Sequence, residues 1–477
     1  MHYDKKYLPV ILCSVISSLA AYGYALFNFT ISIDGEYRDN FSVTISLGRW
    51  LHSLLKLYIL PEPYVPFATV AFGLFIFALS SFIISITLFK DIFLASICSV
   101  LFFSIPQLAY QIQFINQADT VAISFLLGAL SAWLILAGDR NKKNVTLSIL
   151  CMVGSISIYQ SMFNFVPLIA MCYVVSNRMP MNQSLRLLSL VAVLTLISIG
   201  LYFILNKIAQ LIFDINSSSY LSQTVSWGNI TPSETISFLY RFTAGLLSFD
   251  IFYGINVYTL AILVALMVAV YLFVKGMHVE AIMMPCIAFM PFVIVYLFGA
   301  NQAPRTFTAA PVAFSFILTL ALSLINKRTL STAASFGLLC SSSVNASALF
   351  HSDFLARQYD VRMASAIVNA AESVQPSISG KQFKIYFYGG SNGGEWNKLP
   401  KSNVFGSSFF AWDGGNTARI ASFISSYGIA NTIPAPRSFA KNVKKDVSEM
   451  NVWPSKDSIR IIDNVVVVKI GEKVGSY

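Results

Sequence analysis

The sequence predicts an all-α polytopic membrane bundle that is followed by a small α/β domain. Of its 477 residues, 56% are hydrophobic and only 11% are charged, whereas an ordinary soluble domain has roughly 25% charged residues. Several segments run for about 18 residues or more with few or no charges, which is enough to cross a hydrocarbon core of ~30 Å. We expect a membrane domain over residues 1–350 and an extracytoplasmic domain over 351–477.

Nine apolar stretches are each long enough for a single span. They are 7–29, 65–89, 92–110, 121–138, 185–205, 257–274, 281–299, 309–325 and 330–350. A further stretch, 145–176, is too long for one span and short for two, and it is interrupted by the polar run from Tyr159 to Asn164. We expect a short hairpin or re-entrant pair there. Irregular backbone at membrane depth is tolerated only inside protein or beside a wet cavity, so this break is either a cavity wall or a site of plain helix packing.

Lys and Arg predict the orientation, because cytoplasmic loops carry an excess of these residues. With a cytoplasmic N-terminus, the inside residues are Lys5, Lys6, Lys90, Arg140, Lys142, Lys143, Arg178, Arg186, Lys275, Lys327 and Arg328. The outer loops include the long segments 30–64 and 206–256. They hold Arg38, Arg49, Lys56, Lys207, Arg241 and Arg305 before the tail. Nine spans and a hairpin with both ends inside then place the C-terminal domain outside.

The tail reads as a mixture of helices and strands. A helical run covers 351–374, and 384-KIYFYGG-390 is strand-like and leads into SNGG. The run 417-TARIASFISSYG-428 has helical spacing and stops at a glycine. The run 459-IRIIDNVVVVKIG-471 has the pattern of a hairpin that turns at Asp463-Asn464.

Charge is concentrated at the outer boundary of the predicted spans. The segment 32-SIDGEYRDNFS-42 follows the first span and carries Asp34, Glu36, Arg38 and Asp39. Asp119 and Arg305 lie at the outer ends of other spans. The middle of each predicted span has no charged residue, whereas proton relays and ion-coupled pumps keep an ionisable group there. This distribution argues against an ion-coupled transporter and favours chemistry at the outer surface.

These residue types suit transfer of a group from a lipid phosphate to a hydroxyl. A carboxylate within hydrogen-bond reach of a hydroxyl can take its proton as the hydroxyl attacks. An arginine can hold the phosphate leaving group through its planar fork. By itself the DGEYRD run also fits a solvated charged loop.

The next segment, 43-VTISLGRWLHSLLKLY-58, predicts an amphipathic helix. Its apolar face consists of Leu47, Trp50, Leu51, Leu54, Leu55 and Tyr58, and its polar face of Arg49, His52, Ser53 and Lys56. We expect an interfacial helix with a basic stripe at headgroup level. Such a helix is a plausible seat for an anionic lipid donor.

A first span, an acidic loop and then Gly48-Arg49-Trp50 on a horizontal helix resemble the Gtr-type (serotype-converting) O-antigen glucosyltransferases. More broadly, they resemble membrane glycosyltransferases of the type C fold. The likeness covers most of the chain, and 303-APRT-306 fits an arginine near the lipid-phosphate end in that family. Members often carry adjacent acids in the first outer loop, where this sequence has Asp34-Gly35-Glu36.

The resemblance implies a polyprenyl-phosphate-glucose donor lipid and a lipid-linked O-antigen acceptor, the polysaccharide of lipopolysaccharide. It also implies the periplasmic face of the bacterial inner membrane as the place of transfer. In this interpretation Asp34 is the general base, and Glu36 is the other candidate for that role. Glu36 or Asp39 would position the acceptor or donor sugar. Arg305 and Arg49 would bind the donor phosphate, for which Arg38 is a further candidate. The full set of candidates for binding substrate is Arg38, Asp39, Arg49, Asp119 and Arg305.

We expect no metal, no cofactor and no nucleic acid partner. No histidine accompanies Asp34 and Glu36 in sequence, and the cysteines form no CxxC pair. The glycines of 389-GGSNGG-394 match neither a P-loop nor a dinucleotide fingerprint. A run of basic residues interleaved with aromatic residues would favour nucleic-acid binding, and the sequence has no such run.

Two other classes of function stay open. A flippase or uncoupled transporter of lipid-linked saccharide would need a polar path, for which Gln107, Gln111, Gln160 and Asn164 are available. An O-antigen ligase or polymerase would act at the same surface. The tail segment 407-SSFFAWDGGNTAR-419 offers aromatic rings either for stacking on sugars or for a domain core. We expect the tail and the 206–256 loop to help select the acceptor.

Overall fold

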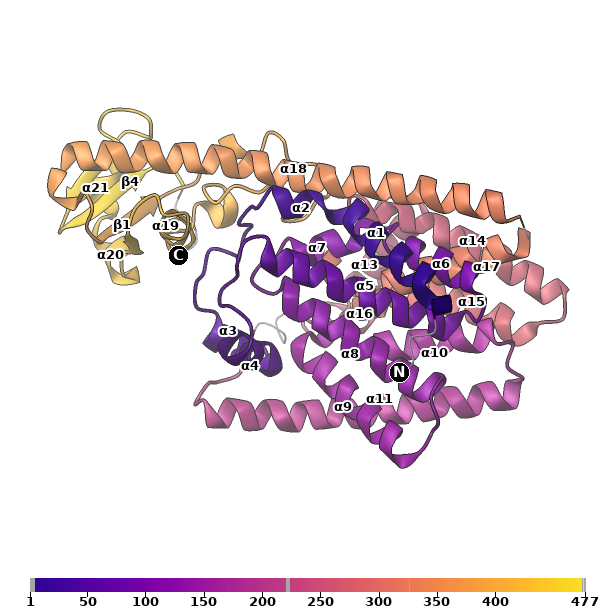
Figure 1. Cartoon of the computed structure of the whole chain (residues 1–477). Coiled ribbons are helices and arrows are strands. Elements are labelled where there is room, and N and C mark those ends of the chain that lie inside the picture. Colours follow the sequence, from indigo (N-terminus) through magenta and orange to yellow (C-terminus); the bar gives the residue numbers. More distant parts are fainter. Residues whose placement is uncertain (1–4, 220–223, 326, 474, 476–477) are drawn as a thin grey trace. The chain divides into compact units, whose positions relative to one another are not determined.

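The computed structural model describes residues 5–219, 224–325, 327–473 and 475 (Figure 1). The chain is mostly helical (68%) with a small sheet near the C-terminus, which confirms the predicted class to that extent. It divides into two compact units. The membrane unit comprises Met1–Phe27 with Asn40–Ser347, and the C-terminal unit comprises Asn28–Asp39 with Ala348–Tyr477.

The membrane unit is a bundle of helices that follow the predicted apolar stretches. Its helices are α1 (Leu8–Tyr22), α2 (Tyr24–Phe27), α3 (Phe41–Ser46), α4 (Trp50–Tyr58), α5 (Ala68–Leu88), α6 (Ile92–Phe102), α7 (Ala109–Ile112), α8 (Ala118–Leu136), α9 (Lys142–Ile158), α10 (Phe165–Ser176), α11 (Met181–Ile212), α13 (Pro232–Leu247), α14 (Tyr258–Val274), α15 (His278–Phe289), α16 (Val293–Phe298), α17 (Ala310–Ile325) and the first part of α18 (Arg328–Val374). Short 3-10 turns η2 (Pro106–Leu108), η3 (Gln160–Asn164) and η6 (Pro304–Thr306) join some of them.

Fewer helices than the nine expected reach the length of a span. In the described part of the chain, six helices are long and apolar enough to cross a membrane. A seventh is counted if Ile92–Phe102 and Pro106–Ile112, bent by 41°, form one span. The first apolar stretch divides into α1 and α2, and α17 has 16 residues. The stretch 145–176 forms α9 and α10, joined by η3 at the polar break.

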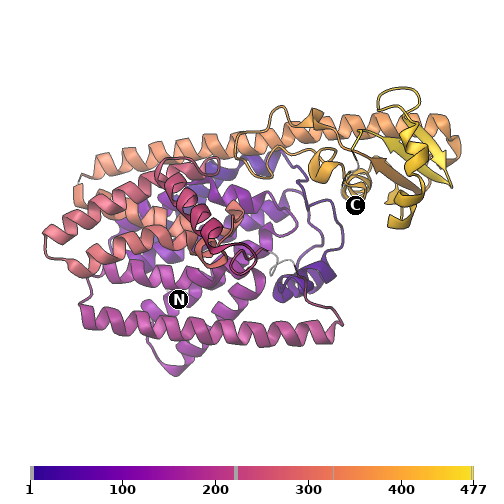
Figure 2. The same ribbon diagram turned by 180° about the vertical axis from the view of Figure 1, so that it is seen from behind.

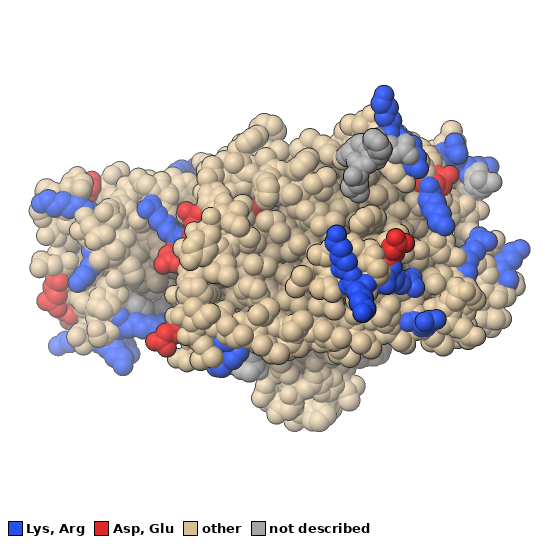
Figure 3. Space-filling model, turned by 60° about the horizontal axis from the view of Figure 1, so that its bottom comes forward, with Lys and Arg blue, Asp and Glu red and all other residues tan. Residues whose placement is uncertain are grey.

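Exposed apolar side chains mark the surfaces that suit lipid. Figures 1 and 2 both show α11 along the edge of the helix bundle. Its exposed residues include Leu196, Phe203, Leu211 and Ile212. On the face seen in Figure 3, charged side chains gather in separate groups, and wide areas between them carry no Lys, Arg, Asp or Glu. Large exposed apolar surfaces of this kind are expected of a membrane protein.

The C-terminal unit contains the predicted strands and hairpin. Its four strands lie in the order β2 (Thr432–Pro434), β1 (Phe383–Tyr388), β4 (Val465–Lys469) and β3 (Ile459–Ile462). β1 is parallel to β2 and β4, and β3 and β4 are antiparallel. Asp463 and Asn464 turn the hairpin with φ of 49° and 59°, and two positive φ angles are what a two-residue type I′ turn requires. The helices of this unit beyond α18 are α19 (Thr417–Ser426), α20 (Arg437–Asn442) and α21 (Lys444–Ser448).

Two expected boundaries differ from the structure. The last predicted span and the tail helix are one continuous helix, α18, of 47 residues. No glycine or proline interrupts the chain between 338 and 375, so the sequence offers no stop signal at 350. The 206–256 segment is not an open loop, because it contains the end of α11 and the whole of α13. Thr231 and Glu234 form a capping box at the start of α13.

Candidate functional site

The acidic segment after the first predicted span belongs to the C-terminal unit, and we call residues 28–39 the acid loop. Asp34 has φ of 74°, a left-handed conformation that Asp tolerates better than most residues. The Ser426 hydroxyl donates to the carbonyl oxygen of Glu36 at 2.7 Å. Arg38 Nη2 donates to the carbonyl oxygen of Ser425 at 2.9 Å. The loop is therefore attached to the C-terminal end of α19.

Arg419 in the first turn of α19 joins three carboxylates. Its Nη1 lies 2.8 Å from Asp34 Oδ1 and 2.6 Å from Glu36 Oε1. Its Nε lies 2.9 Å from Asp413 Oδ2. The Asn416 side chain accepts a hydrogen bond from the Arg419 backbone N–H and so caps the helix that presents this arginine. One guanidinium thus fixes the geometry of both acids that the sequence singles out.

The two acids differ in access to solvent. The Asp34 side chain is 45% exposed, whereas that of Glu36 is fully buried. Burial raises the pKa of Glu36 to about 7, against the attraction of Arg419 and with the repulsion of Asp34. Its Oε2 has no hydrogen-bond partner among the described residues. Asp34 is therefore the more accessible of these two acids, and Glu36 can exchange a proton near neutral pH.

The neighbours of Glu36 are also perturbed. Burial, followed by the charge of Glu36, raises the pKa of Tyr37 to about 12. For Arg419, burial acts to lower the pKa, but the charges of Asp34 and Glu36 outweigh it and hold the pKa above its ordinary value. The arginine therefore stays charged at any pH at which the loop is folded.

In the membrane unit, the polar face of α4 points inward rather than toward headgroups. His52, Ser53 and Lys56 are buried, whereas Leu57 and Tyr58 are exposed. The expectation of a basic stripe at headgroup level is therefore wrong. Its physical reason is that the polar side chains find partners inside the protein, while an apolar outer face suits lipid. The predicted helix is also broken at Gly48, between α3 and α4.

Three polar contacts fasten α4 to the start of α8, and we call this group the α4 cluster. Arg49 Nη1 donates to Gln117 Oε1 at 2.9 Å. His52 Nδ1 and Thr120 Oγ1 are 2.7 Å apart. Lys56 Nζ lies 2.8 Å from Asp119 Oδ2, and both side chains are buried. Asp119, a predicted substrate-binding residue, is thus half of a buried ion pair.

His52 in this cluster is neutral. Burial, followed by the charges of Arg49 and Lys56, lowers its pKa to about 3. A neutral imidazole hydrogen-bonded to a threonine hydroxyl serves packing rather than proton transfer near pH 7.

The polar break near residue 160 packs against Gly48-Arg49. The Arg49 guanidinium carbon lies 5.0 Å from the centre of the Tyr159 ring. Gln160 Nε2 donates to the carbonyl oxygen of Leu47 at 2.7 Å. Gly48 has φ of 82°, and a Cβ there would lie 2.5 Å from the Tyr202 hydroxyl oxygen. A glycine is therefore needed at this position for both conformation and space.

Arg305 lies against the segment that precedes α8. Its guanidinium carbon is 4.2 Å from the centre of the Phe114 ring. Its backbone carbonyl accepts hydrogen bonds from the side-chain amides of Gln107 and Gln111. Because Arg49 bonds to Gln117, both predicted phosphate ligands rest on one stretch of chain, 106–117.

Comparison with known proteins identifies the family. The family described as glucosyl transferase GtrII matches residues 23–341, more than half of the chain. The chain belongs to the GtrII glucosyl transferase family. No curated protein and no solved structure matches it. The family resemblance predicted from the sequence is confirmed, and glucosyltransferase activity is favoured over a flippase or transporter.

The GtrII match includes the acid loop, the α4 cluster and Arg305, but it ends before Arg419. Sequence reasoning missed Arg419. One signal was available in the sequence. Two acids as close together as Asp34 and Glu36 favour a nearby cation, and 416-NTAR-419 places an arginine in the first turn of a predicted helix. Among the other predicted residues, Arg38 and Asp39 are exposed.

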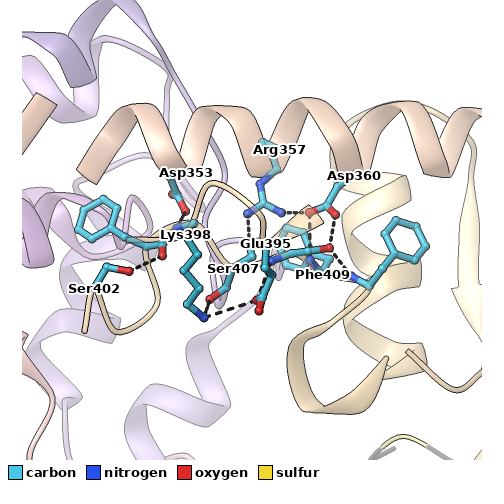
Figure 4. Close-up of polar contacts among 12 residues, drawn as sticks. Asp353, Arg357, Asp360, Glu395, Lys398, Ser402, Ser407 and Phe409 are labelled. Carbon is cyan, nitrogen blue, oxygen red and sulfur yellow. Dashed lines mark hydrogen bonds and ion pairs between the residues drawn. The ribbon is translucent and has the colours of Figure 1, made fainter. Parts of the chain in front are cut away.

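Close to α18, a second network explains the aromatic tail segment of this glucosyltransferase (Figure 4). Arg357 is buried, pairs with Asp360 and lies 4.3 Å from the centre of the Phe409 ring. Asp360 also accepts a hydrogen bond from the Phe409 backbone N–H at 3.0 Å. Phe409 and Phe410 are both fully buried. Their burial supports a role in the domain core rather than stacking on sugars.

The described residues contain no group of three or more His, Cys, Asp or Glu side chains that could hold a metal ion. The carboxylates of the acid loop, Asp34 and Glu36, form ion pairs with Arg419. A guanidinium can neutralise neighbouring carboxylates and fix their geometry through directed hydrogen bonds.

Proposed function

We propose that this GtrII-family glucosyltransferase transfers glucose from a polyprenyl-phosphate-glucose donor to a hydroxyl of lipid-linked O-antigen, as in serotype conversion. The proposed place is the periplasmic face of the bacterial inner membrane, with the N-terminus in the cytoplasm and the C-terminal domain in the periplasm. The observation that carries the proposal is the solvent-accessible Asp34 carboxylate, held by Arg419 beside buried Glu36, in a chain of this family. The apolar helices and the distribution of Lys and Arg support a lipid donor and this orientation.

Asp34 acts as the general base in this proposal. The acceptor hydroxyl oxygen attacks C1 of the donor glucose while Asp34 takes the hydroxyl proton. The bond between C1 and the phosphate oxygen breaks, and polyprenyl phosphate leaves with the electron pair. The exposure of Asp34 favours it over Glu36, whose side chain is buried and whose Oε1 already bonds to Arg419. Glu36 instead shares Arg419 and so helps to orient Asp34.

Arg49 and Arg305 are the proposed ligands of the donor phosphate. Each lies against neutral groups, namely the Gln117 amide and the Tyr159 ring for Arg49 and the Phe114 ring for Arg305. A guanidinium binds phosphate oxygens through its planar, bidentate set of N–H donors.

The remaining predicted residues have different proposed roles. Arg38 and Asp39 are exposed and are candidates for contacting the acceptor. Asp119 supports Arg49 indirectly, because its ion pair with Lys56 holds α4 against α8.

A transfer assay tests the proposed function. Membranes that contain the wild-type chain would be incubated with radiolabelled polyprenyl-phosphate glucose and purified lipid-linked O-antigen. We expect label to move to the polysaccharide in wild type and to stay on the donor lipid with Asp34→Asn. Label that stays on the donor in wild type, or transfer at full rate by Asp34→Asn, would contradict the proposal. Growth in acceptor chain length without loss of donor label would point to a polymerase or ligase.

A further inference from the structure

Two buried glutamines beside Arg305 have amide oxygens without partners. Gln107 and Gln111 are both fully buried. Gln107 Nε2 lies 3.3 Å and 3.4 Å from the backbone oxygens of Pro304 and Arg305, and Gln111 Nε2 donates to the same Arg305 oxygen. Neither Oε1 has a hydrogen-bond partner among the described residues.

The hydrogen bonds to the backbone fix which way each amide faces. Exchanging oxygen and nitrogen in either side chain would place an amide oxygen against a carbonyl oxygen, which is unfavourable. The oxygens of Gln107 and Gln111 are therefore acceptors in the only sensible orientation. A buried amide oxygen without a donor is costly, so two of them one helical turn apart are acceptors that hydroxyl groups of a ligand can satisfy.

A third glutamine on the same stretch has the same property. Gln113 is buried, and neither atom of its side-chain amide has a partner within the described ranges. The ring that carries the Arg305 guanidinium, Phe114, is the next residue. The segment 107–114 thus carries three neutral amides, and the cation of Arg305 lies against its last residue.

We infer that Gln107 and Gln111 bind hydroxyl groups of the donor glucose while Arg305 binds the phosphate linked to it. Two neutral acceptors suit two O–H donors on one sugar ring, and the Arg305 guanidinium, which lies against the ring of Phe114 in the same stretch, suits the phosphate. This inference rests on the proposed function, and it assigns Gln107 and Gln111 as residues that determine which sugar is transferred.

A panel of altered donors tests the inference. The probes are polyprenyl-phosphate glucose and the corresponding monodeoxyglucose donors, each lacking one hydroxyl. We expect wild type to lose at least about tenfold in kcat/KM with one or two of them, because a site built around a hydroxyl rejects the analogue that lacks it. Gln107→Met and Gln111→Met should be slower with glucose, but the penalty for those same deoxy donors should fall to about twofold.

Gln210 provides a matched control. It is also a buried glutamine whose Nε2 donates to a backbone carbonyl, that of Ile45, but its Oε1 accepts from the Ser217 hydroxyl at 2.8 Å. Gln210→Met should keep the full wild-type penalty for each deoxy donor. Equal penalties in wild type and in both Gln107 and Gln111 variants would overturn the inference, as would loss of discrimination in Gln210→Met.

Two further outcomes are distinguishable. If Gln107→Met or Gln111→Met fails to accumulate in membranes, Gln111→Asn keeps both amide atoms but withdraws the oxygen by one bond, and the same panel decides. If wild type transfers glucose but discriminates against no deoxy donor, the inference fails while the proposed function stands. If wild type transfers nothing from the glucosyl donor, the proposed function itself fails.

Discussion

The acid loop and the α4 cluster treat charge in opposite ways. The acid loop places two carboxylates, Asp34 and Glu36, on the guanidinium of Arg419, which also pairs with Asp413, and Asp34 is the loop acid that is open to solvent. In the α4 cluster, the carboxylate of Asp119 is closed off by Lys56. Arg49 there lies against an amide and an aromatic ring.

The difference separates residues suited to chemistry from residues suited to binding and support. An accessible carboxylate can accept the proton of a hydroxyl that comes within hydrogen-bond reach of it. We expect a buried ion pair such as Lys56–Asp119 to act as support, because it holds the helix that carries Arg49 against α8. Burial makes such a pair costly to break, since each partner alone would be an uncompensated buried charge.

The largest expected effect comes from removing the open carboxylate. Asp34→Asn keeps the size of the side chain but cannot take a proton, so we expect transfer to fall about a thousandfold. The readout is the initial rate of label transfer at matched membrane abundance. Asp457→Asn, at an exposed acid paired with Arg460 elsewhere in the C-terminal unit, is the control and should keep its rate. A comparable loss in both variants would speak against a specific role for Asp34.

Next in size is breaking the buried pair of the α4 cluster. Lys56→Met leaves Asp119 buried without its cation, and we expect a loss of about 3 kcal/mol in stability. The measurement is the Tm of the purified chain in detergent. The double variant Lys56→Met with Asp119→Leu should recover most of this loss, because no charge is then left buried. If the Tm of the double variant stays as low as that of Lys56→Met, the loss comes from changed packing and not from an unpaired buried charge.

The pH dependence of stability tests the burial of Glu36. Its pKa is raised from 4.5 to about 7, so the folded state binds a proton that the unfolded state has lost between these values. Its contribution to stability is therefore fully present below about pH 4.5 and is lost as pH rises to about 7, a change of about 3 kcal/mol.

Glu36→Gln removes this titration and is the variant to compare. Wild type should lose Tm between pH 5 and pH 8 because Glu36 loses its proton in this range. Glu36→Gln should lose less Tm over the same range. Parallel pH profiles for the two chains would show that Glu36 does not titrate in this range.

Much of the fold was predictable because its signals are local. The apolar stretches, the hairpin at Asp463-Asn464 and the helix that ends before Gly428 each depend on residues close in sequence. Span boundaries were less predictable. Gly23 divides the first stretch, and the continuity of α18 through residue 350 follows from the absence of any stop signal.

The site was predictable only in part, because its key contacts are distant in sequence. Asp34 and Glu36 stand out by their charge, but Arg419, 383 residues after Glu36, is an unremarkable arginine until the fold brings it there. The two faces of α4 were predicted correctly, but its basic face is buried against the protein instead of lying at headgroup level. In a soluble protein the apolar face points inward, whereas in a membrane polar side chains such as Lys56 turn toward protein partners.

The smallest predicted effect tests whether Arg419, outside the segment that matches the GtrII family, positions Asp34. Arg419→Lys keeps the positive charge but cannot bridge Asp34, Glu36 and Asp413 with one planar group. We expect kcat to fall about tenfold, corresponding to about 1.4 kcal/mol, with little change in KM for the donor. Arg460→Lys, at a partly buried arginine paired with Asp457, is the control and should change neither constant.

A merely structural role for Arg419 would have a different result. It would lower the amount of folded enzyme without changing kcat per folded molecule, so the assay must be normalised by active-protein titration. In the positioning role, Arg419→Lys and Asp34→Asn are not additive, because once the base is absent its orientation no longer matters. The double variant should therefore be as slow as Asp34→Asn alone, and a further tenfold loss would contradict a role that acts through Asp34.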